Sequence, residues 1–192
     1  QMHQIRKEYA QIISNKINDE LKDLEMSNAV LRASVENIGD EKFNCNGLDR
    51  VEFMICTNRG EEEKELSKIA SGGEMSRVML AIKTVLADVD KVLTLVFDEI
   101  DTGISGKAAK AVGEKLKAIS KNHQVMVVTH SASIAAKGKY NYFISKKTIN
   151  DKTYTDIRQL SEKETIEEIA RISSGDVTNI SIAHARELRK VS

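Results

Sequence analysis

The spacing of apolar residues along the chain separates helical segments from strands. Ile5–Leu24 has an apolar residue every three to five positions, with charged and amide side chains between, which is the pattern of an amphipathic helix. The apolar positions of this helix are Ile5, Tyr9, Ile12, Ile17, Leu21 and Leu24. No capping residue precedes the pattern, so a packed surface helix and the end of a longer coiled coil are equally consistent with it. Met26–Glu36 and Val51–Cys56 then predict two adjacent strands, with turn residues at Gly39 and Asn44–Gly47.

In the middle of the chain, segments with a helical period alternate with strand-like apolar runs. Glu61–Glu65 is a run of charges and predicts a solvated loop. Helical patterns over Met75–Ala87 and Gly106–Ser120 then alternate with continuous apolar runs at Val92–Phe97 and Gln124–Thr129. Strands that alternate with helices predict parallel βαβ units and an α/β fold. Because the two runs are apolar on both faces, we expect helices to cover both faces of these strands.

The last part of the chain predicts a hairpin and two helices. Tyr140–Ser145 and Thr153–Leu160 are strand-like segments on either side of an Asn150-Asp151 turn. Lys163–Ser173 and Ile180–Lys190 have helical periodicity. These segments follow the second apolar run without a linker or a low-complexity tract, so we expect them to complete the same domain.

Composition narrows the class of protein. With 192 residues, 41% hydrophobic and 30% charged, the chain has the length and composition of one globular domain, with or without an appendage. No apolar stretch reaches about 18 residues and the start has no apolar signal core, so we expect a cytoplasmic protein with no membrane partner. The 29 basic and 29 acidic residues cancel, so any DNA contact must be local. Cys45 and Cys56 lack metal-ligand spacing and are expected to be small core residues.

Asp98 and Glu99 directly follow the first buried apolar run. A parallel strand that ends in two carboxylates places them at the carboxyl edge of the sheet, where open α/β folds bind ligands. Nucleoside triphosphate cleavage needs an oxygen ligand for Mg²⁺ and a group that orients the attacking water. Asp98 suits the first role and Glu99 the second. An ordinary pair of acids that caps the next turn is an equally good interpretation of these two residues alone.

Two further signals lie near the same predicted edge. Ser71 is a good N-cap, and Gly72 and Gly73 let backbone N–H groups approach an anion at the start of the following helix. His130 ends the second apolar run, where its ring can donate to a phosphate oxygen. Taken singly, a flexible cap and a structural histidine are the more common interpretations. The basic residues of the last third of the chain, Lys137, Lys139, Lys146, Lys147, Arg186, Arg189 and Lys190, are interpreted as solvated surface in preference to DNA contacts.

The order and spacing of these signals resemble a known family. Ser71–Glu74, the strand that ends at Asp98-Glu99 and the strand that ends at His130 look like the signature motif, Walker B motif and switch histidine of ATP-binding-cassette ATPases. The longer strings KIASGGEMSR (68–77), FDEIDTGISG (97–106) and VTH (128–130) resemble the SMC-like ATPases of bacterial DNA repair. The resemblance covers about Met26 to Arg189.

The resemblance implies the carboxyl-terminal half of an ABC/SMC-type ATPase head with a parallel βαβ core. Residues 1–25 would end a coiled coil and residues 26–192 would form the lobe. The implied cofactors are ATP and Mg²⁺, with Asp98 on the metal and with Glu99 and His130 as catalytic residues for the nucleotide of their own head. Ser71, Gly72, Gly73 and Glu74 would contact the nucleotide of the opposite head.

The implied partners are the amino-terminal half of the same head, a second head and DNA. The implied function is ATP-driven head dimerisation and hydrolysis in DNA double-strand break repair and recombination, in a nucleoid-associated protein. The amino-terminal half would carry the phosphate loop GxxxxGK[ST], which this sequence lacks. We therefore expect the chain by itself to be inactive.

The sequence departs from transporter-type cassettes at two positions of the acidic segment. Ile100 stands where transporters have proline, and Ser105 stands where they have aspartate. These differences argue against a transporter subunit and leave the subunit-crossing role of this loop in doubt. Ala70 and Glu74 likewise replace the commoner Leu and Gln of the signature. Another SMC-like or ABC-type ATPase, and a non-catalytic interaction module, are the alternative functions.

Overall fold

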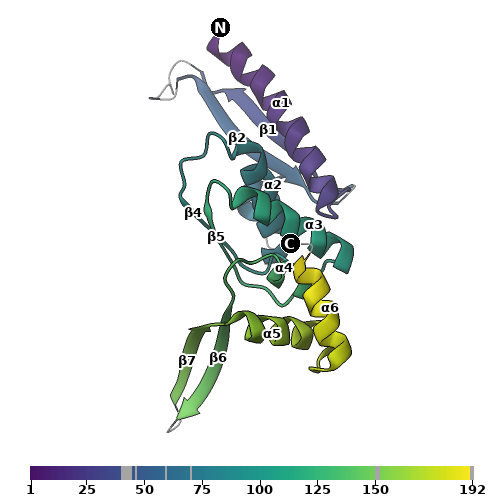
Figure 1. Cartoon of the computed structure of the whole chain (residues 1–192). Coiled ribbons are helices and arrows are strands. Elements are labelled where there is room, and N and C mark those ends of the chain that lie inside the picture. The colour runs from purple at the N-terminus through teal and green to yellow at the C-terminus, as the bar shows by residue number, and fades with distance from the viewer. Residues whose placement is uncertain (40–44, 46, 59, 70, 150–151, 191–192) are drawn as a thin grey trace. The chain divides into compact units, whose positions relative to one another are not determined.

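The computed structural model describes residues 1–39, 45, 47–58, 60–69, 71–149 and 152–190 (Figure 1). The chain forms two compact units, Gln1–Val128 and Thr129–Ser192. In the described ranges, no helix combines the length and apolarity needed to cross a lipid bilayer. The fold is of the predicted mixed class, with helices, antiparallel strands and one parallel pair.

The first unit opens with α1 (Met2–Asp23), which runs beside an antiparallel sheet (Figure 1). The sheet has the order β1 (Val30–Asn37), β2 (Asp49–Cys56) and β3 (Lys64–Glu65), which confirms the two predicted strands. The expected loop at 61–65 is wrong at its end, because Lys64 and Glu65 pair with β2. Backbone pairing does not depend on side-chain charge, and charged residues are common on edge strands.

The free edge of β1 is covered by polar side chains of α1. Asn18 accepts from the backbone N–H of Leu31 at 2.7 Å and donates to the Leu31 carbonyl at 3.0 Å. Ser14 Oγ accepts from the Ala33 N–H at 2.9 Å. These bonds satisfy backbone groups that would otherwise be unpaired at the edge of the sheet. They fix the position of α1 along β1.

The predicted amphipathic helix is confirmed as α1, and its apolar residues lie on two faces. Ile17, Leu21 and Leu24 at its end are fully buried. Ile5, Tyr9 and Ile12 are instead 43%, 61% and 48% exposed. Steps of three to five residues are compatible with either face over a short helix, so spacing alone did not separate the two sets.

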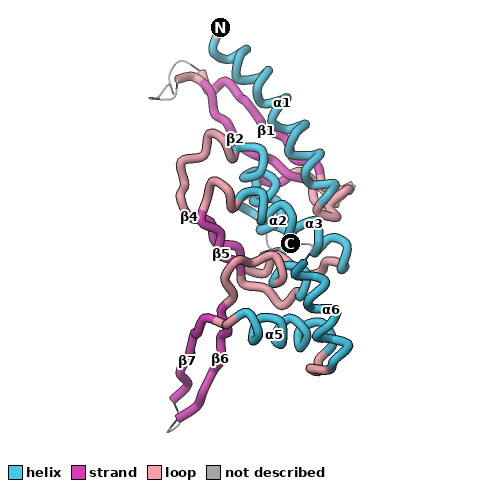
Figure 2. The backbone as a smooth tube through the Cα atoms, in the orientation of Figure 1, coloured by secondary structure: helices cyan, strands magenta, loops and turns pink. Residues whose placement is uncertain are grey.

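The parallel core consists of β4 (Thr94–Phe97) and β5 (Gln124–Val127), with α2 (Gly72–Leu86) before β4 and α3 (Gly106–Ile119) between the strands. The predicted βαβ unit is confirmed. Figures 1 and 2 show both helices on the same side of the strand pair.

One face of the parallel pair is exposed, contrary to expectation. Leu95 and Phe97 are buried, whereas Val96 is 66% exposed and Met126 is 54% exposed. Leu93 and Val128 at the strand ends are also exposed. The prediction that both faces are covered is therefore wrong for the part of the chain that the structure describes. An apolar run indicates that a strand face is buried in the complete protein, but it does not indicate which segment packs on that face.

The second unit contains the predicted hairpin and the two closing helices. The hairpin strands are β6 (Tyr142–Ile149) and β7 (Lys152–Gln159), and the turn expected at Asn150-Asp151 lies outside the described residues. The helices are α5 (Glu162–Ser174) and α6 (Asn179–Lys190). A short helix, α4 (Ala132–Ala135), was not predicted, because four residues are too few to show a helical period.

The second unit has a small core and one well-defined helix cap. One hydrophobic cluster of this core consists of Ala136, Ile169, Ala170 and Ala185. Ser161 caps α5 by accepting from the Glu164 N–H, and the Glu164 carboxylate accepts from the Ser161 N–H at 2.9 Å. This capping box holds the pKa of Glu164 at about 2, mainly through the bond from the Ser161 backbone.

The cysteines are not core residues, so that prediction was wrong. Cys45 is exposed. Cys56 at the end of β2 is partly exposed, and its thiol donates to the carbonyl oxygens of Asn58 at 2.9 Å and Glu61 at 3.3 Å. A short polar side chain that bonds to the following loop stabilises a turn, and such a role leaves no trace in cysteine spacing.

Candidate functional site

The predicted N-cap starts α2. Ser71 has extended backbone dihedrals, and its Oγ accepts from the Glu74 N–H at 3.4 Å. Gly72 and Gly73 are the first two residues of the helix, which therefore begins three residues earlier than the apolar period indicated. Ala70 lies outside the described residues. The helix end, with its unpaired N–H groups and partial positive charge, has the properties of an anion site.

The predicted acidic pair forms a tight turn after β4. Asp98 and Glu99 are both exposed, and one oxygen of Asp98 accepts from the Glu99 N–H at 3.0 Å. Glu99 has a φ of 55°, in the left-handed region that costs a residue with a β-carbon about 1 kcal/mol or more. The Thr102 N–H closes the turn on the Glu99 carbonyl at 3.0 Å. Asp98 thus does support its own turn, as the alternative interpretation held, and its other oxygen has no hydrogen bond from the described residues.

The structure brings the two glycines and the acidic turn together within one chain. A β-carbon on Gly72 would lie 2.5 Å from Glu99 Oε2, closer than real β-carbons approach other atoms. A β-carbon on Gly73 would lie 3.0 Å from the Glu99 carbonyl oxygen and 3.1 Å from the β-carbon of Thr102. The neighbours of Gly73 are backbone atoms and a β-carbon, so packing against the turn favours glycine there, whereas the neighbour of Gly72 is the end of a flexible side chain that can move aside.

Two residues of α2 that the sequence did not single out hold the backbone of the acidic turn. Ser76 Oγ donates to the Asp98 carbonyl at 2.7 Å. Arg77 is buried, and its Nη1 donates to the Thr102 carbonyl at 2.9 Å. Burial lowers the pKa of the Arg77 guanidinium, against the opposite influence of Glu74 and Glu25. A signal for Arg77 was available, because it interrupts the buried apolar face of α2 beside Val78 and Ala81.

His130 belongs to the second unit, whereas the glycines and the acidic turn belong to the first. It is an exposed residue of the second unit, immediately before Ser131, the N-cap of α4. Its proposed contact with a phosphate stays a prediction. The acidic turn and the start of α2, by contrast, belong to the first unit and form one continuous arrangement.

The donor set of the first unit fits a nucleotide with its metal. Within the described ranges, no group of three or more His, Cys, Asp or Glu side chains is placed to hold a metal. Mg²⁺ is commonly bound by one or two carboxylates together with waters and substrate phosphates, so a single Asp98 is a sufficient protein ligand. The start of α2 offers N–H groups to an anion, and Glu99 is the second carboxylate within reach of the same turn.

Relatives of the chain share one name. No family model matches it. The DNA repair protein RecN of Halalkalibacterium halodurans is 40% identical over 187 residues, which cover 96% of this chain and 33% of that protein. RecN proteins of other bacteria match at 35% to 48% identity. The chain thus spans about one third of the length of the curated relatives that it matches.

Solved structures agree on the fold. The Smc head domain of Pyrococcus yayanosii, solved with a coiled coil and joint, aligns over 88% of this chain and 30% of its own, with a TM-score of 0.57 and 19% identity. A chain from structural work on ATP-driven dimerization and DNA-stimulated activation of SMC ATPases aligns over 90% of this chain and 98% of its own, with a TM-score of 0.51 and 19% identity. The chain has the fold of an SMC-type ATPase head and belongs to the RecN family of DNA repair proteins.

Proposed function

We propose that this chain is the carboxyl-terminal half of the ATPase head of a DNA repair protein, in which ATP joins two heads and hydrolysis parts them. The observation that supports the proposal most is the packing of the Gly72-Gly73 helix start on the turn formed by Asp98 and Glu99. The RecN relatives, and the SMC ATPase whose dimerization is driven by ATP, support the same function.

The proposed roles follow from the chemistry of each group. Asp98 is the magnesium ligand, because a carboxylate is a good ligand for a hard cation. Glu99 orients and deprotonates the attacking water, and His130 donates to a phosphate oxygen. Ser71, Gly72, Gly73 and Glu74 present the start of α2 to the nucleotide of a second head. When bound, Mg²⁺ would neutralise charge on the phosphate oxygens during transfer.

The exposed face of the parallel pair supports a missing half of the head. Val96 and Met126 form an apolar surface together with Val128, the residue that follows β5. Exposed apolar surface of this kind marks an interaction site. The relatives are about three times as long as this chain, so they contain sequence that can cover it. We propose that the amino-terminal half, with the phosphate loop, packs on this face.

The exposed face of α1 supports a coiled coil for residues 1–25, followed by the head lobe. Met2, Ile5, Tyr9 and Ile12 are exposed and step by three, four and three residues. This is the spacing of a coiled-coil seam. The opposite interpretation, a plain surface helix, predicts polar residues at these positions.

DNA is a proposed partner of the complete protein, in a cytoplasmic and nucleoid-associated setting, because the relatives are DNA repair proteins. Arg189 is an unfavourable candidate for DNA contact. Its guanidinium is paired with both oxygens of Glu162 at 2.7 Å and donates to the carbonyl oxygens of Ala136 and Gly138. The basic surface of this part of the chain is therefore at least partly structural.

Calorimetry with Mg-ATP tests whether ATP binding requires the amino-terminal half of the head. The 192-residue chain alone should neither bind ATP tightly nor hydrolyse it, and addition of the amino-terminal half should restore both. Micromolar binding with steady phosphate release by the purified chain would show that the phosphate loop is dispensable. Binding that is still absent after the halves associate would favour a non-catalytic interaction module.

Two substitutions in the complete protein separate the roles of the adjacent acids. Glu99→Gln keeps the size of the side chain but removes the base, so turnover should fall by roughly 10² to 10⁴ while the ATP-bound head dimer accumulates. Asp98→Asn should weaken the Mg²⁺-dependent part of ATP binding. The exposed residues Glu62 and Asp88 provide matched controls, Glu62→Gln and Asp88→Asn. Parental turnover in Glu99→Gln, or dimer trapping by Asp98→Asn, contradicts the assignment.

A third substitution tests the helix start. Ser71→Arg places a bulky side chain at the end of α2, so ATP-induced dimers should be lost while ATP binding is retained. Ser67→Arg, the same change at an exposed residue four positions earlier, is the control. Gel filtration with Mg-ATP gives the result. Normal dimers in Ser71→Arg would refute the signature role.

A further inference from the structure

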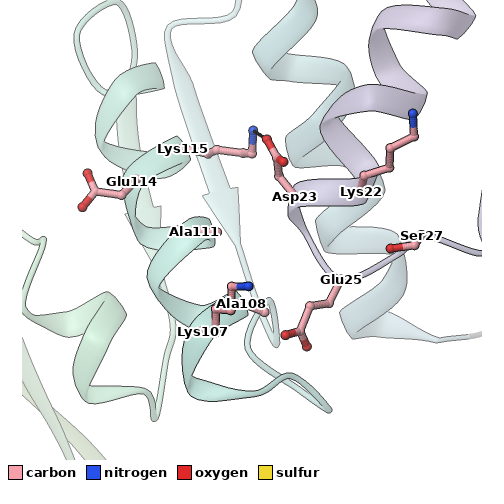
Figure 3. Close-up of a pocket in the computed structure, with 9 residues that line it drawn as sticks. All are labelled: Lys22, Asp23, Glu25, Ser27, Lys107, Ala108, Ala111, Glu114 and Lys115. Carbon is pink, nitrogen blue, oxygen red and sulfur yellow. Dashed lines mark hydrogen bonds and ion pairs between the residues drawn. The ribbon is translucent and has the colours of Figure 1, made fainter.

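An open cavity lies between the end of α1 and the side of α3 that carries Lys107 and Lys115. It has a volume of about 530 Å³ and is lined mainly by charged side chains (Figure 3). These include Lys22 and Asp23 from α1, and Lys107 and Lys115 from α3. Polar contacts link the two helices across this space.

Lys115 makes the first of these contacts. Its Nζ donates to Glu20 Oε2 at 2.5 Å and to Asp23 Oδ2 at 3.0 Å, and its side chain is only 16% exposed. Burial by itself would lower the pKa of Lys115, but the two carboxylates outweigh that effect and raise it. The last turn of α1 is thus bound to the middle of α3.

Glu25 makes the second contact, with the N-cap of α3 that follows the acidic turn. Ser105 Oγ donates to Glu25 Oε1 at 2.6 Å. As the N-cap of α3, Ser105 Oγ also accepts from the Ala108 N–H. Glu25 has a φ of 57°, the left-handed conformation that is unusual for a side chain of this size. Figure 3 shows the Glu25 side chain extending toward the loop that precedes α3.

Ser105 is the N-cap of α3 and lies three residues after Thr102, which closes the acidic turn. Ser76 and Arg77 hold the backbone of Asp98 and Thr102 from α2. Glu25 holds the other end of the same segment from the residues that follow α1. The segment that carries both acids is therefore fixed between two helices, by side chains that do not reach the carboxylates themselves.

We propose that Glu25 is a positioning residue for ATP hydrolysis, which acts through Ser105 on the segment that carries Asp98 and Glu99. In this chain the residue at 105 makes a contact within its own chain, at the position where transporter cassettes carry aspartate. The inference rests on the proposed function, since it assigns a role within that reaction. It predicts that the orientation of α1 influences the geometry of the acidic turn.

Loss of the Glu25–Ser105 hydrogen bond should slow turnover without weakening ATP binding. The contact involves neither the magnesium ligand nor the start of α2. In the complete protein we expect Glu25→Ala to lower kcat by roughly threefold to tenfold with KM unchanged, in keeping with the net contribution of one exposed hydrogen bond. Hydrogen exchange of the amides at 99–105 should become faster in the same variant. Glu25→Gln keeps an acceptor and should retain most of the parental rate.

Paired substitutions at Ser105 separate positioning from helix capping. Asn and Asp both cap helices well, so either one preserves the start of α3. Ser105→Asn keeps a donor for Glu25 and should retain turnover. Ser105→Asp has no donor at neutral pH and repels Glu25, so it should match Glu25→Ala, and the double variant Glu25→Ala with Ser105→Asp should be no slower than either single variant. Lys107→Ala, in the same cavity, is the control and should leave kcat unchanged.

The two proposals fail in different ways. If the parental complete protein does not hydrolyse ATP, the proposed function fails, while hydrogen exchange at 99–105 still decides whether Glu25 orders the turn. If Ser105→Asp turns over at the parental rate with unchanged exchange, the positioning role is refuted. Equal losses in Ser105→Asn and Ser105→Asp, or additive losses in the double variant, also refute it, because they assign the effect to capping or general stability.

Discussion

The two sheets of the first unit both expose one face, but the exposed faces differ in chemistry. On β1 and β2 the exposed side chains include Arg32, which pairs with Glu63 at 2.7 Å, and Arg50, which pairs with Glu52 at 2.6 Å. On β4 and β5 the central exposed pair is Val96 and Met126. The first face has the composition of a surface in contact with water. The second has the composition of an interface.

This difference shows that exposure alone does not distinguish a solvated surface from a binding interface. Charged pairs on β1 and β2 lose little by remaining solvated, and they discourage contact with other strands. Apolar side chains on β4 and β5 gain roughly 25 cal/mol for each Å² that a partner removes from water. The parallel pair, which ends at the acidic turn, is therefore where the rest of the protein is expected to attach.

The largest effect should come from a charge on the apolar face. Val96→Lys places an ammonium group where the proposed amino-terminal half packs, and burying an unpaired charge costs several kcal/mol. The affinity of the complete protein for Mg-ATP should therefore fall by about 100-fold or more, as measured by calorimetry. Val30→Lys makes the same change on the exposed face of β1 and should bind ATP normally. Equal binding by both variants would remove the distinction between the two faces.

The next largest effect contrasts two arginines of the first unit. Arg77→Ala removes a buried donor to the Thr102 carbonyl and should lower the free energy of unfolding by about 2 to 3 kcal/mol. Arg50→Ala, on the charged face, should cost less than about 0.5 kcal/mol. Urea denaturation of each variant checks both values. Similar losses would indicate that the charged face is structural and not merely solvated.

A smaller effect is expected from the capping box of the second unit, with a definite pH dependence. The folded pKa of Glu164 is about 2, below its ordinary value of 4.5. Its stabilising contribution is therefore present above pH 4.5 and is lost as the pH falls toward 2. Thermal unfolding should show Glu164→Gln as less stable than the parent at neutral pH and equal to it near pH 2. Glu167→Gln on the same helix is the control, and a pH-independent difference would contradict the prediction.

The smallest effect should come from the charged face itself. Glu63→Gln removes the partner of Arg32, whose hydrogen bond holds the pKa of Glu63 below its ordinary value. The expected loss is about 0.2 to 1 kcal/mol and should shrink as salt is added. Denaturation at low and high ionic strength measures it. A loss that does not respond to salt would mean that packing, and not charge, maintains this face.

Local patterns in the sequence sufficed for most elements of the fold. The helices α2, α3, α5 and α6 and the pairs β1–β2, β4–β5 and β6–β7 match the predicted segments closely, because side-chain period and turn residues are local properties. Two elements were not predicted from the sequence. The helix α4 is too short to show a helical period, and the charged strand β3 pairs with β2 through its backbone. The exposure of Val96 was not predicted for a different reason, because an apolar run does not show which part of the protein covers the strand.

The candidate site was predicted in part. Ser71 is the expected N-cap, and the expected acids lie directly against the expected glycines. The residues that hold the acidic turn were missed, because Arg77 and Thr102 are 25 positions apart and Glu25 and Ser105 are 80 apart. A donor that binds a distant carbonyl or carboxylate leaves no spacing pattern in the sequence. Only the interruption of an apolar helix face by Arg77 could have indicated one of them.

The left-handed backbone of Glu99 has a consequence for laboratory evolution. Glycine adopts a φ of 55° without strain, so Glu99→Gly should relax the turn while it removes the proposed base. A selection that rewards only soluble expression should therefore enrich glycine at position 99 and accumulate inactive protein. A selection that demands DNA repair should keep glutamate despite its strain. Sequencing of variant libraries after each selection would measure the frequency of glycine and glutamate at position 99. We expect stability to favour glycine and activity to favour glutamate.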